Sequence, residues 1–282
     1  MTKLNVTIRR VQNKYYRLIA GGKTKPVQLN KKEKTMSFPA SVQGRWGFEK
    51  DVTTSKKHKL GTIMQIEDTY YRYVKAGEDL IAGQLLEAPA LIANHNDDLV
   101  VAANGTAGDS SVSVTVGGTA VTKNQYQDGY LYFNLPTATS GQTSSGFKYR
   151  IREHAAIDSS GTGSFTIDDA GGLAVGIVAG TDKAGLIPNL GSDVLIANTT
   201  ELGPLVGVTQ NDIADNSYGW AQFYGHSICE IQGTPGITLS LMRSNGTQGA
   251  LEVSDGTQGL VGHMGRTAGV DTEFHEVFLN IG

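Results

Sequence analysis

The residues that could do chemistry are scattered along this chain of 282 residues. No serine lies in a Gly-x-Ser-x-Gly elbow, and the aspartate pairs Asp97-Asp98 and Asp168-Asp169 lie outside any EF-hand pattern. No two histidines have the spacing of zinc ligands, since they lie at His58, His95, His154, His226, His263 and His275. We therefore expect no catalytic residues, no bound metal and no cofactor, so the chain is predicted not to be an enzyme.

Two further motifs that could bind or react have simpler interpretations. Gly22-Lys23-Thr24 resembles the end of a phosphate-binding loop, but Arg17 stands where that pattern requires a glycine. Cys229 is the single cysteine, so an intramolecular disulfide is excluded. It lies in the strand-like run Ser227–Ile231, which predicts a buried, unreactive side chain.

Three aromatic residues, Trp220, Phe223 and Tyr224, could form a patch that stacks on a sugar. They lie in a segment where apolar and polar residues alternate. Aromatic residues favour half-buried positions in sheets, so the alternation favours core positions over a sugar site.

The elements that must position these residues are strands. Apolar and polar residues alternate in Ser111–Val116 and Phe147–Arg152, Glu276–Ile281 is predicted to be a final strand, and helical periods are scarce. The 36 glycines are spread along the chain, which suits short strands joined by tight turns. Two similar turn units, Ser244–Gly249 and Ser254–Gly259, predict a meander. The fold class is therefore all-β, with a β-barrel or sandwich body.

The predicted domain organisation separates an arm from this body. Residues 1–59 form an extended basic N-terminal arm, and residues 60–282 form the all-β body. Within the body we expect 60–92 to pair with 171–282 as the main β-domain, and 95–170 to form an inserted β-module.

Charge divides the chain at the same place. Residues 1–59 hold 15 lysines and arginines against three acidic residues, a balance of +12, while residues 60–282 hold nine against 24, a balance of −15. A basic arm could bind nucleic acid, the acidic body of a neighbouring subunit or another acidic protein surface. Nucleic acid ranks behind the protein surfaces, because no nucleic-acid module is visible and the acidic body repels phosphates. The candidate binding residues are Arg9, Arg10, Lys14, Tyr15, Tyr16, Arg17, Lys31, Lys32 and Trp46.

Two features that the sequence lacks, a secretory signal and a membrane span, predict the compartment in which the chain is made. No secretory signal follows Met1, since the first 35 residues are rich in lysine and arginine. No run reaches the ~18 apolar residues of a membrane span. We expect synthesis in a cytoplasm-like compartment and no membrane partner.

Several segments resemble structural proteins of tailed bacteriophages: Tyr71–Pro89, Asn124–Ala156, Leu205–Gly225 and Val270–Ile281. The likeness covers most of residues 60–282 in pattern and none of the arm. Within that group the chain resembles capsid decoration proteins, also called cement or head-stabilising proteins. It implies a β-domain bound in many copies to an assembled icosahedral head, commonly as homotrimers.

These observations lead to one first hypothesis and two alternatives. The first is a capsid decoration protein whose arm binds the major capsid protein. It would be made in the host cytoplasm and then lie on the capsid exterior of the virion. The alternatives are a phage tail or fibre component that binds a host surface, and a virion-associated glycan hydrolase, which would need two carboxylates converging in a cleft.

Overall fold

The computed structural model of the chain describes residues 8–11, 14–18, 24–26, 41–134 and 144–281. The chain divides into two units, Met1–Pro39 and Ala40–Gly282. Strands make up nearly all of the regular structure, and the one helical element among the described residues is the 3-10 turn η1 (Phe48–Lys50). The all-β fold class predicted from alternation is confirmed.

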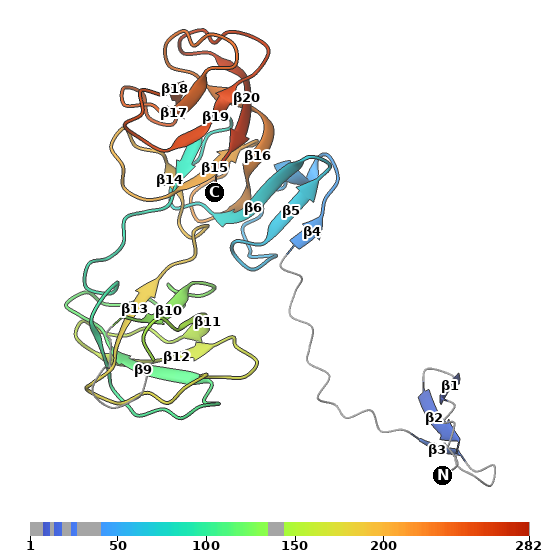
Figure 1. Ribbon diagram of the computed structural model, residues 1–282, viewed down its shortest axis with the longest axis vertical. Coiled ribbons are helices and arrows are strands. Elements are labelled where there is room, and N and C mark those ends of the chain that lie inside the picture. Colours follow the sequence, from blue (N-terminus) through green and yellow to red (C-terminus); the bar gives the residue numbers. More distant parts are fainter. Residues whose placement is uncertain (1–7, 12–13, 19–23, 27–40, 135–143, 282) are drawn as a thin grey trace. The chain divides into compact units, whose positions relative to one another are not determined.

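Within the predicted arm, the described residues form a small sheet of their own (Figure 1). Its strands are antiparallel in the order β1 (Ile8–Val11), β2 (Lys14–Leu18) and β3 (Thr24–Pro26). The register places Arg9 opposite Tyr16 and Arg10 opposite Tyr15. Backbone hydrogen bonding thus brings several of the candidate binding residues together on two adjacent strands.

The larger unit is organised around β16 (Tyr218–Glu230), the longest strand of an eleven-stranded sheet. The first half of β16 pairs with β6 and β15, and its second half pairs with β20. The sheet order is β14-β7-β15-β16-β20-β19-β17-β18, and β4 and β5 join it through β6. The strands are β4 (Ser41–Gln43), β5 (Ile63–Ile66), β6 (Thr69–Lys75), β7 (Leu85–Glu87), β14 (Leu195–Ile196), β15 (Leu205–Thr209), β17 (Ser240–Arg243), β18 (Leu251–Val253), β19 (Leu260–Met264) and β20 (Phe274–Asn280).

The core of this sheet is built by alternation. In β20, Val277 and Leu279 are fully buried and their neighbours are not. They share a cluster with Cys229 of β16, whose thiol pKa is raised to about 12 by burial. The prediction of a buried Cys229 is confirmed, and the raised pKa keeps the thiol protonated and unreactive at neutral pH.

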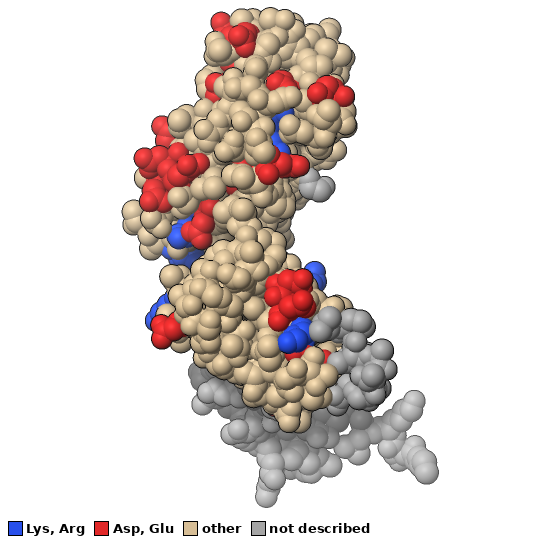
Figure 2. Space-filling model, turned by 90° about the vertical axis from the view of Figure 1, so that its left-hand side faces the viewer, with Lys and Arg blue, Asp and Glu red and all other residues tan. Residues whose placement is uncertain are grey.

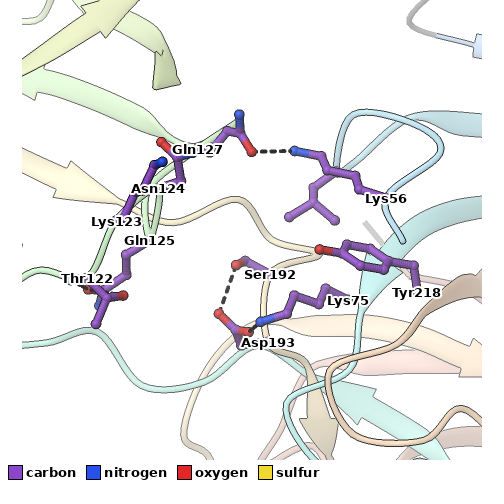
Figure 3. A pocket seen from close by; sticks show the side chains of 11 residues that line it. Lys56, Lys75, Thr122, Lys123, Asn124, Gln125, Gln127, Ser192, Asp193 and Tyr218 are labelled. Atoms are coloured by element: carbon purple, nitrogen blue, oxygen red, sulfur yellow. Dashed lines mark hydrogen bonds and ion pairs between the residues drawn. The ribbon is translucent and has the colours of Figure 1, made fainter. Parts of the chain in front are cut away.

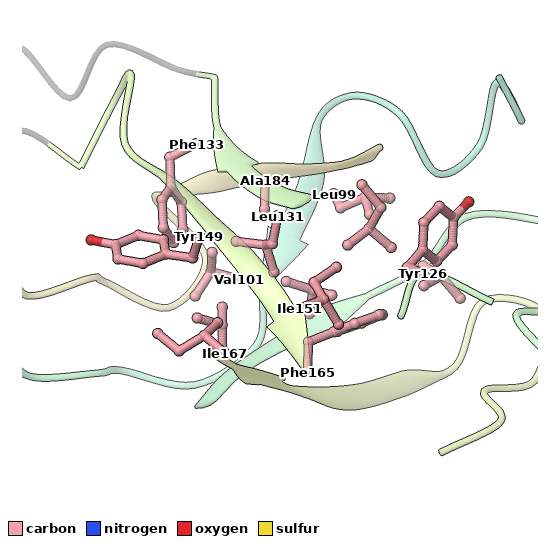
Figure 4. Packing of buried hydrophobic residues seen from close by; sticks show 14 of the residues in the cluster. Leu99, Val101, Tyr126, Leu131, Phe133, Tyr149, Ile151, Phe165, Ile167 and Ala184 are labelled. Carbon is pink, nitrogen blue, oxygen red and sulfur yellow. The ribbon is translucent and has the colours of Figure 1, made fainter. Parts of the chain in front are cut away.

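Besides the eleven-stranded sheet, the larger unit contains a closed six-stranded barrel in the order β10-β11-β12-β9-β8-β13 (Figure 1). Closure leaves no free sheet edge. Figure 4 shows Leu131, Tyr149, Ile151 and Phe165 packing inside it. Its strands are β8 (Leu99–Val101), β9 (Ser111–Thr115), β10 (Tyr130–Phe133), β11 (Lys148–His154), β12 (Thr162–Ile167) and β13 (Lys183–Ile187).

The boundaries of the barrel differ from those of the predicted module. The prediction ended the module at residue 170, whereas the barrel strands run from Leu99 to Ile187. The last strand, β13, pairs with both β8 and β10 and so closes the barrel. This closure depends on pairing between distant segments, which local alternation does not reveal.

The boundary of the arm also differs. Residues 41–59 belong to the larger unit, although their positive charge led the sequence analysis to place them in the arm. β4 pairs in parallel with β5, and Thr53 exchanges two backbone hydrogen bonds with Tyr218. Backbone pairing does not depend on side-chain charge, so the change in charge did not mark the change in structure.

One of the two predicted turn units makes a hairpin. Ser244–Gly249 joins β17 to β18, and these strands pair directly. Ser254–Gly259 leads instead to β19, which pairs with the other edge of β17. The meander is therefore interrupted at the second turn.

Candidate functional site

The barrel is attached to the segment before β5 through Asp128. The buried Asp128 carboxylate accepts a hydrogen bond from the Leu60 N–H (2.9 Å). Lys56 Nζ lies 2.5 Å from one of its oxygens, and Arg150 Nη2 lies 3.8 Å from the other. Asn189 Nδ2 donates to the carbonyl oxygens of both Leu60 (3.1 Å) and Asp128 (3.0 Å). These bonds stabilise the attachment of the barrel.

A pocket of about 240 Å³ adjoins this attachment (Figure 3). In Figure 3, Lys56 and Tyr218 face the turn that carries Lys123 across the opening. Two of the three lysines that line it already have acidic partners, because Lys75 Nζ lies 2.5 Å from Asp193 and Lys56 pairs with Asp128. This pairing reduces their attraction for a bound anion, and we interpret the pocket as a crevice between barrel and sheet.

A larger hollow of about 470 Å³ lies against β16. We call it the Trp46 groove, after the tryptophan on its rim, which is 58% exposed. The loop after β4, η1 and the strands β6, β16 and β20 all contribute to its walls. The residues that line it are Trp46, Glu49, Lys50, Tyr71, Gln210, Gln222, His226, Ser227, Ile228 and Glu276.

The rim of the groove is held by a tight turn. Gly47 has a φ of 105°, a conformation that favours glycine. This turn lets the Gly47 N–H donate to Glu49 Oε2 (2.6 Å), and Glu49 is only 7% exposed. Asn211 Nδ2 donates to the Lys50 carbonyl oxygen (2.8 Å), which ties η1 to the loop between β15 and β16. The backbone that carries Trp46 is therefore fixed at several points.

The floor of the groove contains buried amides. Gln222 is 1% exposed, and its Nε2 donates to the carbonyl oxygens of Tyr224 (3.2 Å) and His226 (2.7 Å). Gln210 Nε2 donates to Ser227 Oγ (2.8 Å). No hydrogen bond within the described ranges involves Gln222 Oε1 or Glu49 Oε1. The groove thus retains acceptors that a ligand could use.

Glu276, which also lines the groove, is surrounded by donors. It accepts hydrogen bonds from the backbone N–H (3.0 Å) and Nη2 (3.2 Å) of Arg266, and His226 Nδ1 lies 3.2 Å away. The backbone hydrogen bond from Arg266 is the main cause of the lowered pKa of this carboxyl. Its negative charge is therefore offset locally.

The structure separates the nine candidate binding residues of the sequence analysis. Arg9, Arg10, Lys14, Tyr15, Tyr16 and Arg17 lie in β1 and β2. Lys31 and Lys32 lie outside the described residues. Trp46 lies in the larger unit, on the groove. Sequence reasoning missed the groove because its walls come from distant segments, although the exposed-looking Trp46-Gly47 turn was a local signal for it.

The aromatic patch considered in the sequence is not assembled as one exposed surface. Trp220 is 4% exposed and belongs to a core cluster, as the alternation predicted. Phe223 is half-buried, with the guanidinium of Arg72 4.9 Å from its ring centre. Tyr224 alone of the three is exposed.

The histidines that the barrel encloses have structural partners. His95 lies 2.7 Å from the Tyr126 hydroxyl and 2.8 Å from the Thr119 carbonyl oxygen. A carbonyl only accepts, so Nε2 of His95 donates to Thr119. His154 Nε2 accepts from the Tyr126 N–H (3.0 Å), and Nδ1 donates to the Ala155 carbonyl oxygen (2.8 Å). Both rings thus connect segments within the fold.

Among the described residues, no three His, Cys, Asp or Glu side chains come together in a group that could hold a metal ion. In the same part of the chain, no helix has the length and apolar character needed to span a membrane. Comparison with protein-family models, curated proteins and solved structures found no significant match.

Proposed function

We propose that the protein is a virion structural protein that decorates the assembled head of a tailed bacteriophage. The observation that carries the proposal is the opposite charge of the two units. Met1–Pro39 holds ten basic residues and one glutamate, a balance of +9, whereas Ala40–Gly282 holds 14 basic and 26 acidic residues, a balance of −12. On the face shown in Figure 2, acidic patches are the more prominent over the described part. The likeness of several segments to phage decoration proteins supports the same function.

In this proposal the basic unit makes most of the contact with the major capsid protein. A −12 body is repelled by an acidic shell, and a +9 unit reverses the sign of the interaction locally. Charges on the unit increase the rate of encounter and fix the orientation, while Tyr15 and Tyr16 supply apolar contact that slows release. Trp46 lies outside this unit, so the proposed contact consists of the other eight candidate residues.

The remaining parts of the proposal follow from the resemblance. The protein acts without catalysis, assembles as a homotrimer on the capsid exterior, and is present in the host cytoplasm before assembly. Trimer contacts would also cover the edge strands of the open eleven-stranded sheet, which are liable to pair with other chains.

Deletion of residues 1–39 tests the proposed mode of attachment. The truncated protein retains β4 and its pairing with β5, so it is expected to fold, which circular dichroism can check. It should no longer bind capsids that lack the decoration protein, measured by co-sedimentation. A truncated protein that saturates capsids at the same concentration as the full chain would disprove attachment through the arm.

Copy number distinguishes this function from that of a tail or fibre component, which the Trp46 groove would suit. Quantitative mass spectrometry of purified particles should return hundreds of copies for a decoration protein. A handful of copies would assign the protein to the tail instead.

A further inference from the structure

We propose that the Trp46 groove is a binding site for a neutral glycan. This inference does not depend on attachment through the arm, because the groove belongs entirely to the larger unit. It assigns a ligand class to a site that the proposed structural function does not use.

The chemistry of the groove matches the two kinds of surface that a sugar ring presents. One kind is an apolar face of C–H groups, which packs on a flat aromatic ring. Trp46 offers such a ring, since it is 58% exposed and no aromatic ring of the described residues stacks on it. The other kind is the set of hydroxyl groups around the ring edge, which donate to fixed acceptors such as carboxylates and amide oxygens.

Two largely buried side chains that line the same groove carry acceptor oxygens. Gln222 and Glu49 are 1% and 7% exposed, and each has a side-chain oxygen that bonds to no other described residue. A ligand hydroxyl group that donates to either oxygen gains a hydrogen bond with a fixed acceptor, and this bond contributes to affinity. Ligand sites commonly combine apolar and aromatic walls with a few well-placed polar groups of this kind.

The charge balance favours a neutral ligand over the basic arm of another copy. Glu276 is offset by Arg266, whose Nη2 lies 3.2 Å from its Oε1. Glu49 is followed directly by Lys50, which also lines the groove. No excess of negative charge is left to attract lysines and arginines, and no excess of positive charge is left to attract phosphate or sulfate.

The site is also largely formed before a ligand arrives. The Gly47 N–H fixes the Glu49 carboxylate, and the backbone carbonyl oxygens of Tyr224 and His226 fix the amide of Gln222. Preorganised polar groups lose little conformational freedom on binding, which raises the affinity of a weak ligand.

The test applies the full-length protein to an array of purified neutral bacterial capsular polysaccharides and O-antigens. Oligosaccharides prepared from any bound polysaccharide are then titrated while tryptophan fluorescence is recorded. Trp46 and Trp220 are the two tryptophans of the chain, and Trp220 is buried, so a change in the signal reports on Trp46. We expect saturable binding that Trp46→Ala weakens at least about tenfold, measured for the variants by calorimetry.

Two further variants make the result specific. Glu49→Gln keeps the shape of the side chain and an acceptor for the Gly47 N–H, and it should weaken binding several-fold. Phe274→Ala removes a comparably exposed aromatic ring of β20 that does not line the groove, and it should leave binding unchanged. Thermal melts check that all three variants remain folded.

Three outcomes overturn the proposal. The first is the absence of binding to every polysaccharide of the array, and the second is binding that Trp46→Ala does not weaken. The third is saturable binding of a synthetic peptide of residues 1–39 that Trp46→Ala abolishes, which would assign the groove to the arm of a neighbouring copy. Capsid binding by the Trp46→Ala variant is measured in parallel. Because the groove lies outside the arm, a variant that loses glycan binding should still bind capsids, so the two proposals can fail separately.

Discussion

At the residue scale, one buried ion pair joins segments far apart in the sequence. Glu87 of β7 accepts a hydrogen bond from Arg243 Nη1 of β17 (2.8 Å), and both side chains are almost fully buried. Glu87 Oε1 also accepts from the Asn198 N–H (2.8 Å), and Arg243 Nε donates to Gln258 Oε1 (2.9 Å). The pair therefore connects two strands and two loops.

We predict that Glu87→Gln destabilises the larger unit strongly. The substitution keeps the shape of the side chain but leaves the exposed Glu201 carboxylate as the remaining acidic partner of the buried Arg243 guanidinium. Breaking a buried pair by removing one charge costs about 3–5 kcal/mol. The measurement is the free energy of unfolding in urea. Lys75→Met, which breaks the more exposed pair with Asp193, is the control and should cost no more than about 1 kcal/mol. Equal losses for the two variants would contradict this view of the buried pair.

At the element scale, the barrel is predicted to lose stability in mild acid. His154 ends β11, and burial lowers its pKa below the ordinary value of 6.5, although a hydrogen bond to Ala155 opposes the shift. The unfolded chain therefore binds a proton at this site more readily than the folded barrel. The stability that depends on neutral His154 is fully present above about pH 6.5 and is lost as pH falls from there through the folded pKa.

Thermal melts between about pH 7.5 and pH 5 measure this dependence, in the range where a histidine titrates. His154→Gln should be less stable at neutral pH and should show a smaller loss on acidification, because it cannot titrate. His263→Gln removes an exposed histidine that has no ion pair within the described ranges, and it serves as the control, which should retain the acid dependence of the parent. An unchanged slope for His154→Gln would show that another group causes the loss.

At the scale of the whole molecule, the division of charge predicts that capsid binding weakens as salt rises. Exposed charges are screened beyond a Debye length of about 10 Å at 0.1 M salt and about 3 Å at 1 M. Single exposed pairs contribute only about 0–1 kcal/mol each, so Lys14→Ala should have little effect by itself. Combined replacement of Arg9, Arg10, Lys14 and Arg17 by alanine should abolish most of the salt dependence.

The measurement is the amount of protein bound to capsids across a salt series. If affinity is the same at low and high salt, apolar contacts rather than charge hold the protein on the shell. If the full chain binds DNA tightly and ignores capsids, the nucleic-acid interpretation of the arm replaces the protein-surface one.

The sequence by itself determined the fold class, because strand alternation is a local property. Phe147–Arg152 alternates strictly and overlaps β11, and the predicted final strand Glu276–Ile281 overlaps β20. The burial of Cys229 and Trp220 followed from the same local pattern.

Only the tertiary structure decided which strands pair and where distant side chains meet. β13 closes the barrel through non-local hydrogen bonds, and Glu87 meets Arg243 across more than 150 residues of sequence. The Trp46 groove likewise joins a loop near residue 46 to the middle of β16 and to β20. Such contacts depend on how the sheet twists and folds back on itself, and the order of residues along the chain carries little direct record of that geometry.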